Sequence, residues 1–250
     1  MLKFKLLYYL STRNFLPGFN TLHYFISKLL VKFISKKYYF ILNLNDPTSY
    51  KSYSYKYSSY EKYKQWQKFG NSLKQKSVWV KESNIKKIIK NLNFDKKKIS
   101  VLCLGTRNGT EQKYFKKYIS KNSSVLGLEI SDSAKNYKDT VQWDFNIYNP
   151  KFKNKFDLLY SNSHDHMYDK IKTLKIWIKY LKSGGILVLD QASSHGRLYN
   201  DSMDPTSFET ELLPYEILSI SKNKLFPIKM LSANDESKNM RRKIFLFKHE

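Results

Sequence analysis

Cysteine is almost absent from the 250-residue sequence, and the single one, Cys103, excludes an internal disulfide framework and fits a reducing compartment. Because Cys103 lies in an apolar run, we expect a small core residue there and not a nucleophile. No uninterrupted apolar stretch reaches the roughly 18–20 residues that span a bilayer, and no small-residue cleavage site follows the apolar N-terminal part. We therefore expect a cytoplasmic protein without a transmembrane span.

Glycine is scarce as well, with 8 residues, whereas average usage is roughly 7 %. Hydrophobic residues make up 41 % of the chain and aromatic residues 16 %, which favours a packed core over disorder. Five glycines lie at or near turns and strand ends that the pattern predicts, namely Gly105, Gly109, Gly127, Gly184 and Gly185.

Acidic residues are few at the front of the chain. Of the 45 basic and 21 acidic residues, residues 1–100 hold 21 and 4, a net charge of +17, and the remainder carries only +7. This excess could attract nucleic acid or an anionic membrane surface. It could also reflect a general richness in Lys, Asn, Ile, Tyr and Phe, and we favour this second explanation.

The front of the chain is predicted to be helical. Residues 1–45 are apolar and aromatic with interspersed lysines, which indicates one or two basic amphipathic helices that pack on the domain or lie on a membrane surface. Residues 46–60 alternate Ser, Tyr and Lys, a pattern that could stack on and neutralise nucleotides and that fits a polar linker at least as well. Two further helices are expected, one from Tyr60 with an aromatic face and one over residues 83–92 with Ser83 as its N-cap. The aromatic face consists of Tyr60, Tyr63, Trp66, Phe69 and Leu73.

The stretch from Ile99 to Ile130 organises the rest of the chain. A short apolar run is followed by a glycine loop, a helical pattern and a second apolar run that ends on Glu129. This order is the plan of a βαβ nucleotide-binding unit. Gly105 and Gly109 let the backbone turn and approach a ligand, and the helix points free N–H groups at the same place. At the tip of the neighbouring strand, a carboxylate can accept both hydroxyls of a ribose.

Residues 103–109, Cys-Leu-Gly-Thr-Arg-Asn-Gly, resemble the first motif of class I S-adenosylmethionine-dependent methyltransferases. In that motif an acidic residue precedes three glycines at alternate positions. Cys103 stands where the acid is usual, and Arg107 stands where the middle glycine is usual. Later segments resemble further landmarks of the family in the same order, namely residues 141–145, 156–163 and 181–189.

The resemblance implies an α/β fold with a doubly wound, mostly parallel seven-stranded sheet that ends in an antiparallel hairpin. Gly184 would cap a helix, residues 206–218 would form the last helix, and residues 226–231 and 243–247 would form the hairpin. The domains expected are an N-terminal helical extension and linker over residues 1–77 and a methyltransferase domain over residues 78–250.

The same resemblance implies S-adenosyl-L-methionine as the cofactor. Glu129 would bind the ribose hydroxyls, Asp144 would accept from the adenine amino group, and Phe145 would flank the adenine ring. The cofactor residues implied are Gly105, Thr106, Arg107, Asn108, Gly109, Glu129, Asp144, Phe145 and Ser161.

The segment after the fourth predicted strand, residues 161–169, holds the densest group of reactive side chains. In open α/β sheets this edge faces the ligand, and a histidine there could deprotonate a hydroxyl substrate. Alternatively, the histidines shape the loop and contact the adenosine. We predict no metal site, because adjacent residues rarely point the same way. The candidate catalytic residues are His164, Asp165 and His166, and the candidate contacts for an anionic substrate group are His195 and Arg197.

We therefore predict a methyltransferase that acts on a small molecule or on a glycan or lipid precursor. The segment after the fourth strand lacks the Asn/Asp-Pro-Pro-Tyr/Phe signature of enzymes that methylate amino groups of nucleic acids and proteins. The alternatives are an RNA methyltransferase that uses basic residues 1–100, and a non-catalytic binding protein that keeps the fold. Peripheral membrane contact through residues 1–45 stays open. A nicotinamide dehydrogenase is disfavoured, because the loop lacks G-x-G-x-x-G spacing.

Overall fold

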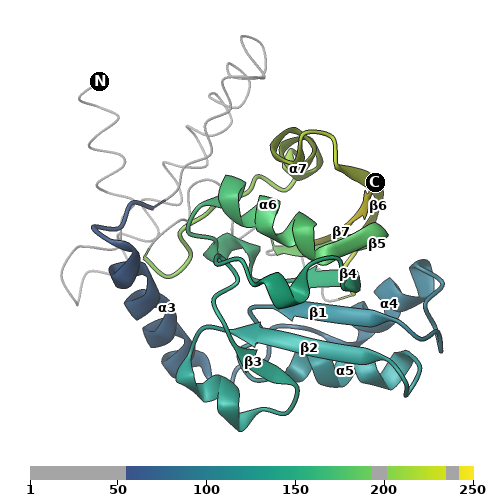
Figure 1. Cartoon of the computed structure of the whole chain (residues 1–250), viewed down its shortest axis with the longest axis horizontal. Coiled ribbons are helices and arrows are strands. Elements are labelled where there is room, and N and C mark those ends of the chain that lie inside the picture. The colour runs from purple at the N-terminus through teal and green to yellow at the C-terminus, as the bar shows by residue number, and fades with distance from the viewer. Residues whose placement is uncertain (1–54, 193–201, 235–241) are drawn as a thin grey trace. The chain divides into compact units, whose positions relative to one another are not determined.

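A computed structural model describes residues 55–192, 202–234 and 242–250 of the chain (Figure 1). The predictions for residues 1–45, for the first part of the linker and for His195 and Arg197 lie outside the described residues. By their contacts, residues 54–250 form one compact unit.

Seven strands form a single mixed sheet in the order β3–β2–β1–β4–β5–β7–β6 (Figure 1). β7 is antiparallel to β5 and β6, whereas the other neighbouring pairs are parallel. The winding reverses between β1 and β4, and such a switch point leaves a crevice beyond the carboxyl ends of the strands. The predicted fold class is confirmed. The strands are β1 (Ser100–Leu104), β2 (Ser124–Glu129), β3 (Thr140–Gln142), β4 (Phe156–Ser161), β5 (Leu181–Ala192), β6 (Leu225–Ser232) and β7 (Arg242–His249).

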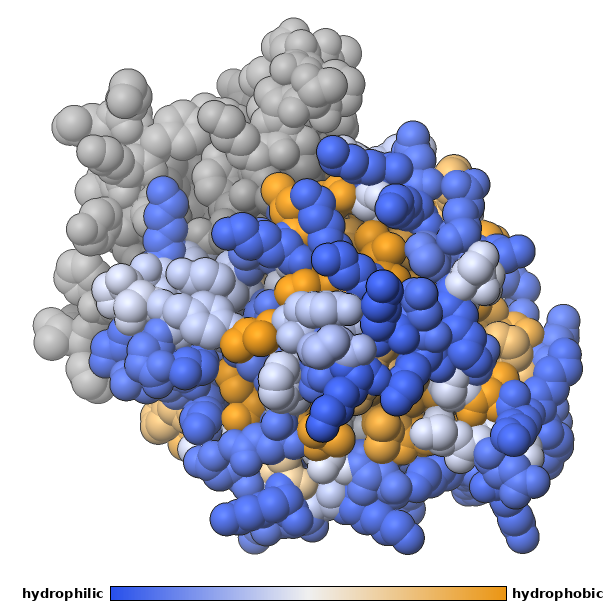
Figure 2. All heavy atoms as spheres, in the orientation of Figure 1, coloured by the Kyte–Doolittle hydropathy of each residue, from blue (hydrophilic) through white to orange (hydrophobic). Residues whose placement is uncertain are grey.

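Helices connect and cover the strands. The α-helices described are α3 (Tyr60–Lys74), α4 (Glu82–Asn91), α5 (Thr110–Tyr118), α6 (Lys170–Tyr180) and α7 (Leu213–Ser221). Short 3-10 helices are η1 (Asp132–Asn136), η2 (Pro150–Phe152) and η3 (His164–His166). None of the described helices is long and apolar enough to cross a membrane. Figure 2 shows hydrophilic side chains over most of the visible described surface, with apolar atoms in smaller patches between them.

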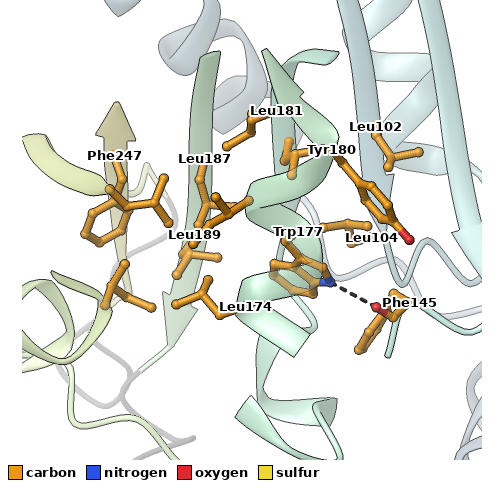
Figure 3. Close-up of a cluster of buried hydrophobic side chains, with 14 of the residues drawn as sticks. Leu102, Leu104, Phe145, Leu174, Trp177, Tyr180, Leu181, Leu187, Leu189 and Phe247 are labelled. Carbon is orange, nitrogen blue, oxygen red and sulfur yellow. Dashed lines mark hydrogen bonds between the residues drawn. The ribbon is translucent and has the colours of Figure 1, made fainter. Parts of the chain in front are cut away.

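The two faces of the sheet carry two separate cores, because side chains alternate between faces along a strand. Leu102 and Leu104 of β1 belong to the cluster that includes Trp177 of α6 (Figure 3). Val101 and Cys103 belong to the opposite cluster, with residues of α4 and α5. Burial raises the pKa of the Cys103 thiol well above its usual value, in agreement with the core position expected for it.

Three local predictions differ from the structure. Helix α4 begins at Glu82, so Ser83 lies inside the helix and Lys81 occupies the N-cap position. Gly184 has the expected positive φ of 73°, yet α6 ends four residues earlier. It lies instead in a bulge of β5, where the pairing with β4 shifts register.

The last helix is the third difference, because α7 starts at Leu213 with a proline in its first turn. The residues before it are held by other contacts, and the backbone N–H of Thr206 donates to the carbonyl of Asp165 at 2.8 Å. A chain tied to the η3 segment in this way cannot continue the helix backwards to residue 206.

Candidate active site

The loop between β1 and α5 turns sharply at the carboxyl edge of the sheet. Gly105 has φ +80°, and a Cβ added there would lie 2.7 Å from the Cβ of Ser163. Gly109 has φ +72° and occupies the N-cap position of α5. Both glycines therefore satisfy the backbone requirement expected of the loop, since positive φ is costly for other residues.

Glu129, the last residue of β2, points its carboxylate at this loop. Its two oxygens accept from the backbone N–H groups of Arg107 at 3.0 Å and Ser131 at 2.8 Å. These bonds fix the side chain, and each carboxylate oxygen still has a second acceptor position.

A cavity of about 60 Å³, the first cavity, lies beside the loop. Glu129, Asp144, Phe145 and Gly105 line it together. The indole N–H of Trp177 donates to the carbonyl of Phe145 at 3.2 Å, which anchors the loop after β3 that carries this ring (Figure 3). Four of the residues that were predicted from separate segments to bind one ligand therefore surround one space.

Helix α3 forms the opposite wall of the first cavity, through a face that only partly coincides with the expected aromatic face. Tyr63 of the expected face is buried, whereas Phe69 and Leu73 are 49 % and 62 % exposed. Beside Tyr63 the helix buries polar and small residues, because this face packs on a polar site. The buried residues are Tyr63, Gln67, Gly70 and Asn71, and all of them line the cavity.

A second cavity, of about 310 Å³, adjoins the first. Arg107, Ser163 and His166 are among the residues that line both cavities. Thr106 and Asn108 of the glycine loop line the second cavity. Gly109, the N-cap residue of α5, is not among the described residues that line either cavity.

His166 lies at the junction of the two cavities in a fixed orientation. Its Nδ1 lies 2.7 Å from Gln67 Oε1, and the Gln67 amide nitrogen donates to the carbonyl of Met203 at 2.9 Å. Since the Gln67 oxygen is thus an acceptor, Nδ1 carries the proton. The Nε2 atom faces Asp204 Oδ1 at 3.5 Å and Asp165 Oδ1 at 3.8 Å.

The described structure also shares its fold with solved proteins. It matches 1,6-didemethyltoxoflavin-N1-methyltransferase of Burkholderia thailandensis, solved with 1,6-didemethyltoxoflavin and S-adenosylhomocysteine, with a TM-score of 0.60 and 14 % identity over 79 % of this chain and 93 % of that chain. The chain has the fold of the S-adenosylmethionine-dependent methyltransferases. The cyclase SpnF matches with a TM-score of 0.53 and 12 % identity over 67 % of this chain and 80 % of its own. No family model and no curated protein matches the sequence.

Within this methyltransferase fold, the acid usual at the end of β1 is replaced by Cys103, and a different acid lies nearby. Glu111, in the first turn of α5, is buried and lines the second cavity. It accepts from the Asn162 amide at 3.2 Å, and burial raises its pKa to about 7. Its Oε2 has no hydrogen-bond partner among the residues that the structure describes. Sequence analysis missed Glu111, because an acid in the first turn of a helix is common without any function.

Two predicted site residues of the methyltransferase fold point elsewhere. His164 is buried, donates from Nε2 to Gln191 Oε1 at 2.5 Å and lies against Phe208. Ser161 is also buried, and its hydroxyl donates to the carbonyl of Leu104 at 3.1 Å. Neither is among the described residues that line the cavities. The structure therefore does not support the catalytic role predicted for His164 or cofactor contact by Ser161. Both side chains are instead buried and bond to neighbouring strands, His164 to Gln191 of β5 and Ser161 to Leu104 of β1.

Asp204 is a site residue that sequence analysis missed. It follows β5 and precedes α7, 38 residues after His166, and it lines the second cavity. Its sequence signal is an Asp-Pro pair, which by itself indicates only a turn.

Proposed function

We propose that the protein is an S-adenosylmethionine-dependent methyltransferase that acts on a small molecule. The observation that carries the proposal is the convergence of Glu129, Asp144 and the Gly105 turn on one cavity. A Cβ at Gly105 would clash with Ser163, so only glycine lets the turn pack this closely against the residues that line the cavity. The fold alone does not decide the reaction, and the likeness to SpnF illustrates this.

The residues present fit an adenosyl group. Glu129 would accept from the ribose hydroxyls, and Asp144 would accept from the adenine amino group. Phe145, which lines the same cavity, would contact the adenine ring. When bound, the cofactor supplies a methyl group on a sulfonium, which an in-line nucleophile accepts. The work of the chain is then to align the acceptor with that methyl group and to keep the acceptor atom deprotonated.

We infer that helix α3 shifts outward when the cofactor binds. Ligand pockets usually measure roughly 300–1,000 Å³, whereas the first cavity measures about 60 Å³. The wall that α3 contributes is held by single hydrogen bonds, among them one from the Tyr63 hydroxyl to the carbonyl of His166 at 3.0 Å. We infer that cofactor entry replaces such contacts.

The acceptor would occupy the second cavity, whose volume of about 310 Å³ suits a small molecule or one end of a glycan or lipid precursor. His166 lines both cavities and therefore lies where acceptor and methyl group would meet. We assign the activation of the acceptor to His166 together with the carboxylates of Asp165 and Asp204.

A labelling experiment tests this function and the acceptor class together. The full chain is incubated with S-adenosylmethionine carrying a labelled methyl group, in one arm with a small-molecule and lipid extract and in another with total RNA. We expect a component of the small-molecule and lipid extract to become labelled. This labelling should be lost with the Glu129→Gln variant. It should persist with Glu82→Gln, which makes the same Glu-to-Gln change outside the cavities. Label in RNA, or equal labelling by Glu129→Gln, would overturn the proposal.

A further inference from the structure

We propose that Asp165, His166 and Asp204 bind a divalent cation at the junction of the two cavities. Each residue offers one ligand atom, and these atoms lie within 4.8 Å of one another. The three residues come from two separate segments, η3 and the segment before α7, and all of them line the second cavity.

The distances between the ligand atoms of these side chains fit a cation shared by the three residues better than direct hydrogen bonds between them. The distances from His166 Nε2 to the two carboxylates, 3.5 and 3.8 Å, exceed normal hydrogen-bond lengths. Around a metal with ligand distances of about 2.0–2.2 Å, neighbouring ligand atoms lie roughly 3.0–3.6 Å apart. The distance from Nε2 to Asp204 matches this range and the distance to Asp165 is slightly longer, so the three ligand atoms, which lie within 4.8 Å of one another, would draw together on a bound cation.

The orientation of His166 is the one that a metal ligand requires. Because Nδ1 bonds to Gln67, Nε2 is the ring nitrogen that faces the two carboxylates and is available to a cation. Histidines that bind metals usually donate their other N–H to such an acceptor, which fixes the ring. Gln67 is itself held by the carbonyl of Met203, so the orientation does not depend on the cluster.

A second and independent observation indicates that this cavity takes a ligand. Glu111 is only 6 % exposed, lines the same cavity and has a carboxyl oxygen without a hydrogen-bond partner among the described residues. A buried carboxyl in this state is costly unless a guest in the cavity satisfies it. The cavity therefore presents a third acid, besides Asp165 and Asp204, to whatever occupies it.

One imidazole and two carboxylates suit Mn²⁺, Fe²⁺ or Zn²⁺, and three protein ligands leave positions open for an acceptor oxygen. A cation held by Asp165, His166 and Asp204 would let an acceptor hydroxyl lose its proton to water more easily. The acceptor oxygen would then form the bond to the methyl carbon, while the carbon–sulfur bond breaks with its electron pair going to sulfur. This catalytic use rests on the proposed function, whereas cation binding itself does not.

The test is a titration of the full chain with Mn²⁺, after treatment with a chelator and dialysis. Binding is monitored by calorimetry and by the loss of the electron paramagnetic resonance signal of free Mn²⁺. We expect one saturable site, and we expect the pulsed spectrum of the bound Mn²⁺ to show the nitrogen modulation of a coordinated imidazole. Asp204→Asn should weaken binding at least about tenfold, and Gln67→Leu by about 10–100-fold. Asp95→Asn, an exposed control, should leave it unchanged. No saturable binding of Mn²⁺ or Zn²⁺ by the unaltered chain would overturn the site, whatever the folding of the variants.

The catalytic use is tested separately. We expect the labelling activity to fall with a chelator and to return with Mn²⁺. Activity that persists in the chelator would overturn a catalytic cation and leave His166 as an unassisted base. If S-adenosylhomocysteine does not bind at all, the proposed function fails, while the Mn²⁺ titration still decides whether the site exists.

Discussion

The hydroxyl of Tyr60 donates to Asp144 Oδ2 at 2.6 Å, which ties helix α3 to the strand end on the far side of the first cavity. Burial and the neighbouring carboxylate raise the pKa of Tyr60 far above its usual value, so it stays a donor. The other oxygen of Asp144 accepts from the backbone and side chain of Asn146. The carboxylate proposed to bind adenine is therefore already paired, and the adenine amino group must compete with Tyr60.

Removal of the Tyr60 hydroxyl should strengthen cofactor binding. One hydrogen bond contributes about 0.5–1.5 kcal/mol, so we expect Tyr60→Phe to lower the Kd for S-adenosylhomocysteine about 2- to 10-fold in calorimetry. Tyr215→Phe, at an exposed position of α7, is the control. A Kd that rises tenfold would show that Tyr60 contacts the ligand and does not compete with it.

The Gly105 turn should tolerate no side chain. In Gly105→Ala the new Cβ meets Ser163 and the positive φ is strained, so we expect at least about tenfold weaker binding of S-adenosylhomocysteine. Gly184→Ala is matched in φ but has open space around it, and should cost only about 1 kcal/mol of stability with unchanged affinity. Urea unfolding measures the loss of stability in each variant, and calorimetry measures the affinity for S-adenosylhomocysteine. An affinity of Gly105→Ala equal to that of the unaltered chain would contradict the proposed role of the turn in binding.

Glu111 should make stability depend on pH. Its pKa is about 7 in the folded protein and near 4.5 when exposed, so the folded state binds the extra proton between these values. The stabilisation is complete below about pH 4.5 and is lost as pH rises through 7, a change of about 3 kcal/mol. In Glu111→Gln this component disappears. Urea unfolding at pH 5 and pH 8 measures it, with Glu61→Gln as control, and an unchanged pH profile in Glu111→Gln would refute the assignment.

The sheet, and the convergence of Gly105, Glu129 and Asp144 on one cavity, were predictable from the order of short sequence signals along the chain. The apolar run of β1 and the glycine turn adjoin in sequence, the acid that ends β2 follows the next apolar run, and parallel strands bring their carboxyl ends to one edge. The wall from α3 was not predictable by hydrophobicity, because its buried face carries Gln67 and Asn71. Asp204 was missed because its partner His166 is distant in sequence, and only the tertiary fold brings them together.

Calorimetric titration of the full chain with S-adenosylhomocysteine tests the central claim, that Glu129 beside the Gly105 turn holds an adenosyl group. We predict saturable binding by the unaltered chain, at least about tenfold weaker binding by Glu129→Gln through loss of charged hydrogen bonds, and unchanged binding by Glu82→Gln. An unaltered chain that does not bind, or a Glu129→Gln variant that binds equally well, would contradict the account.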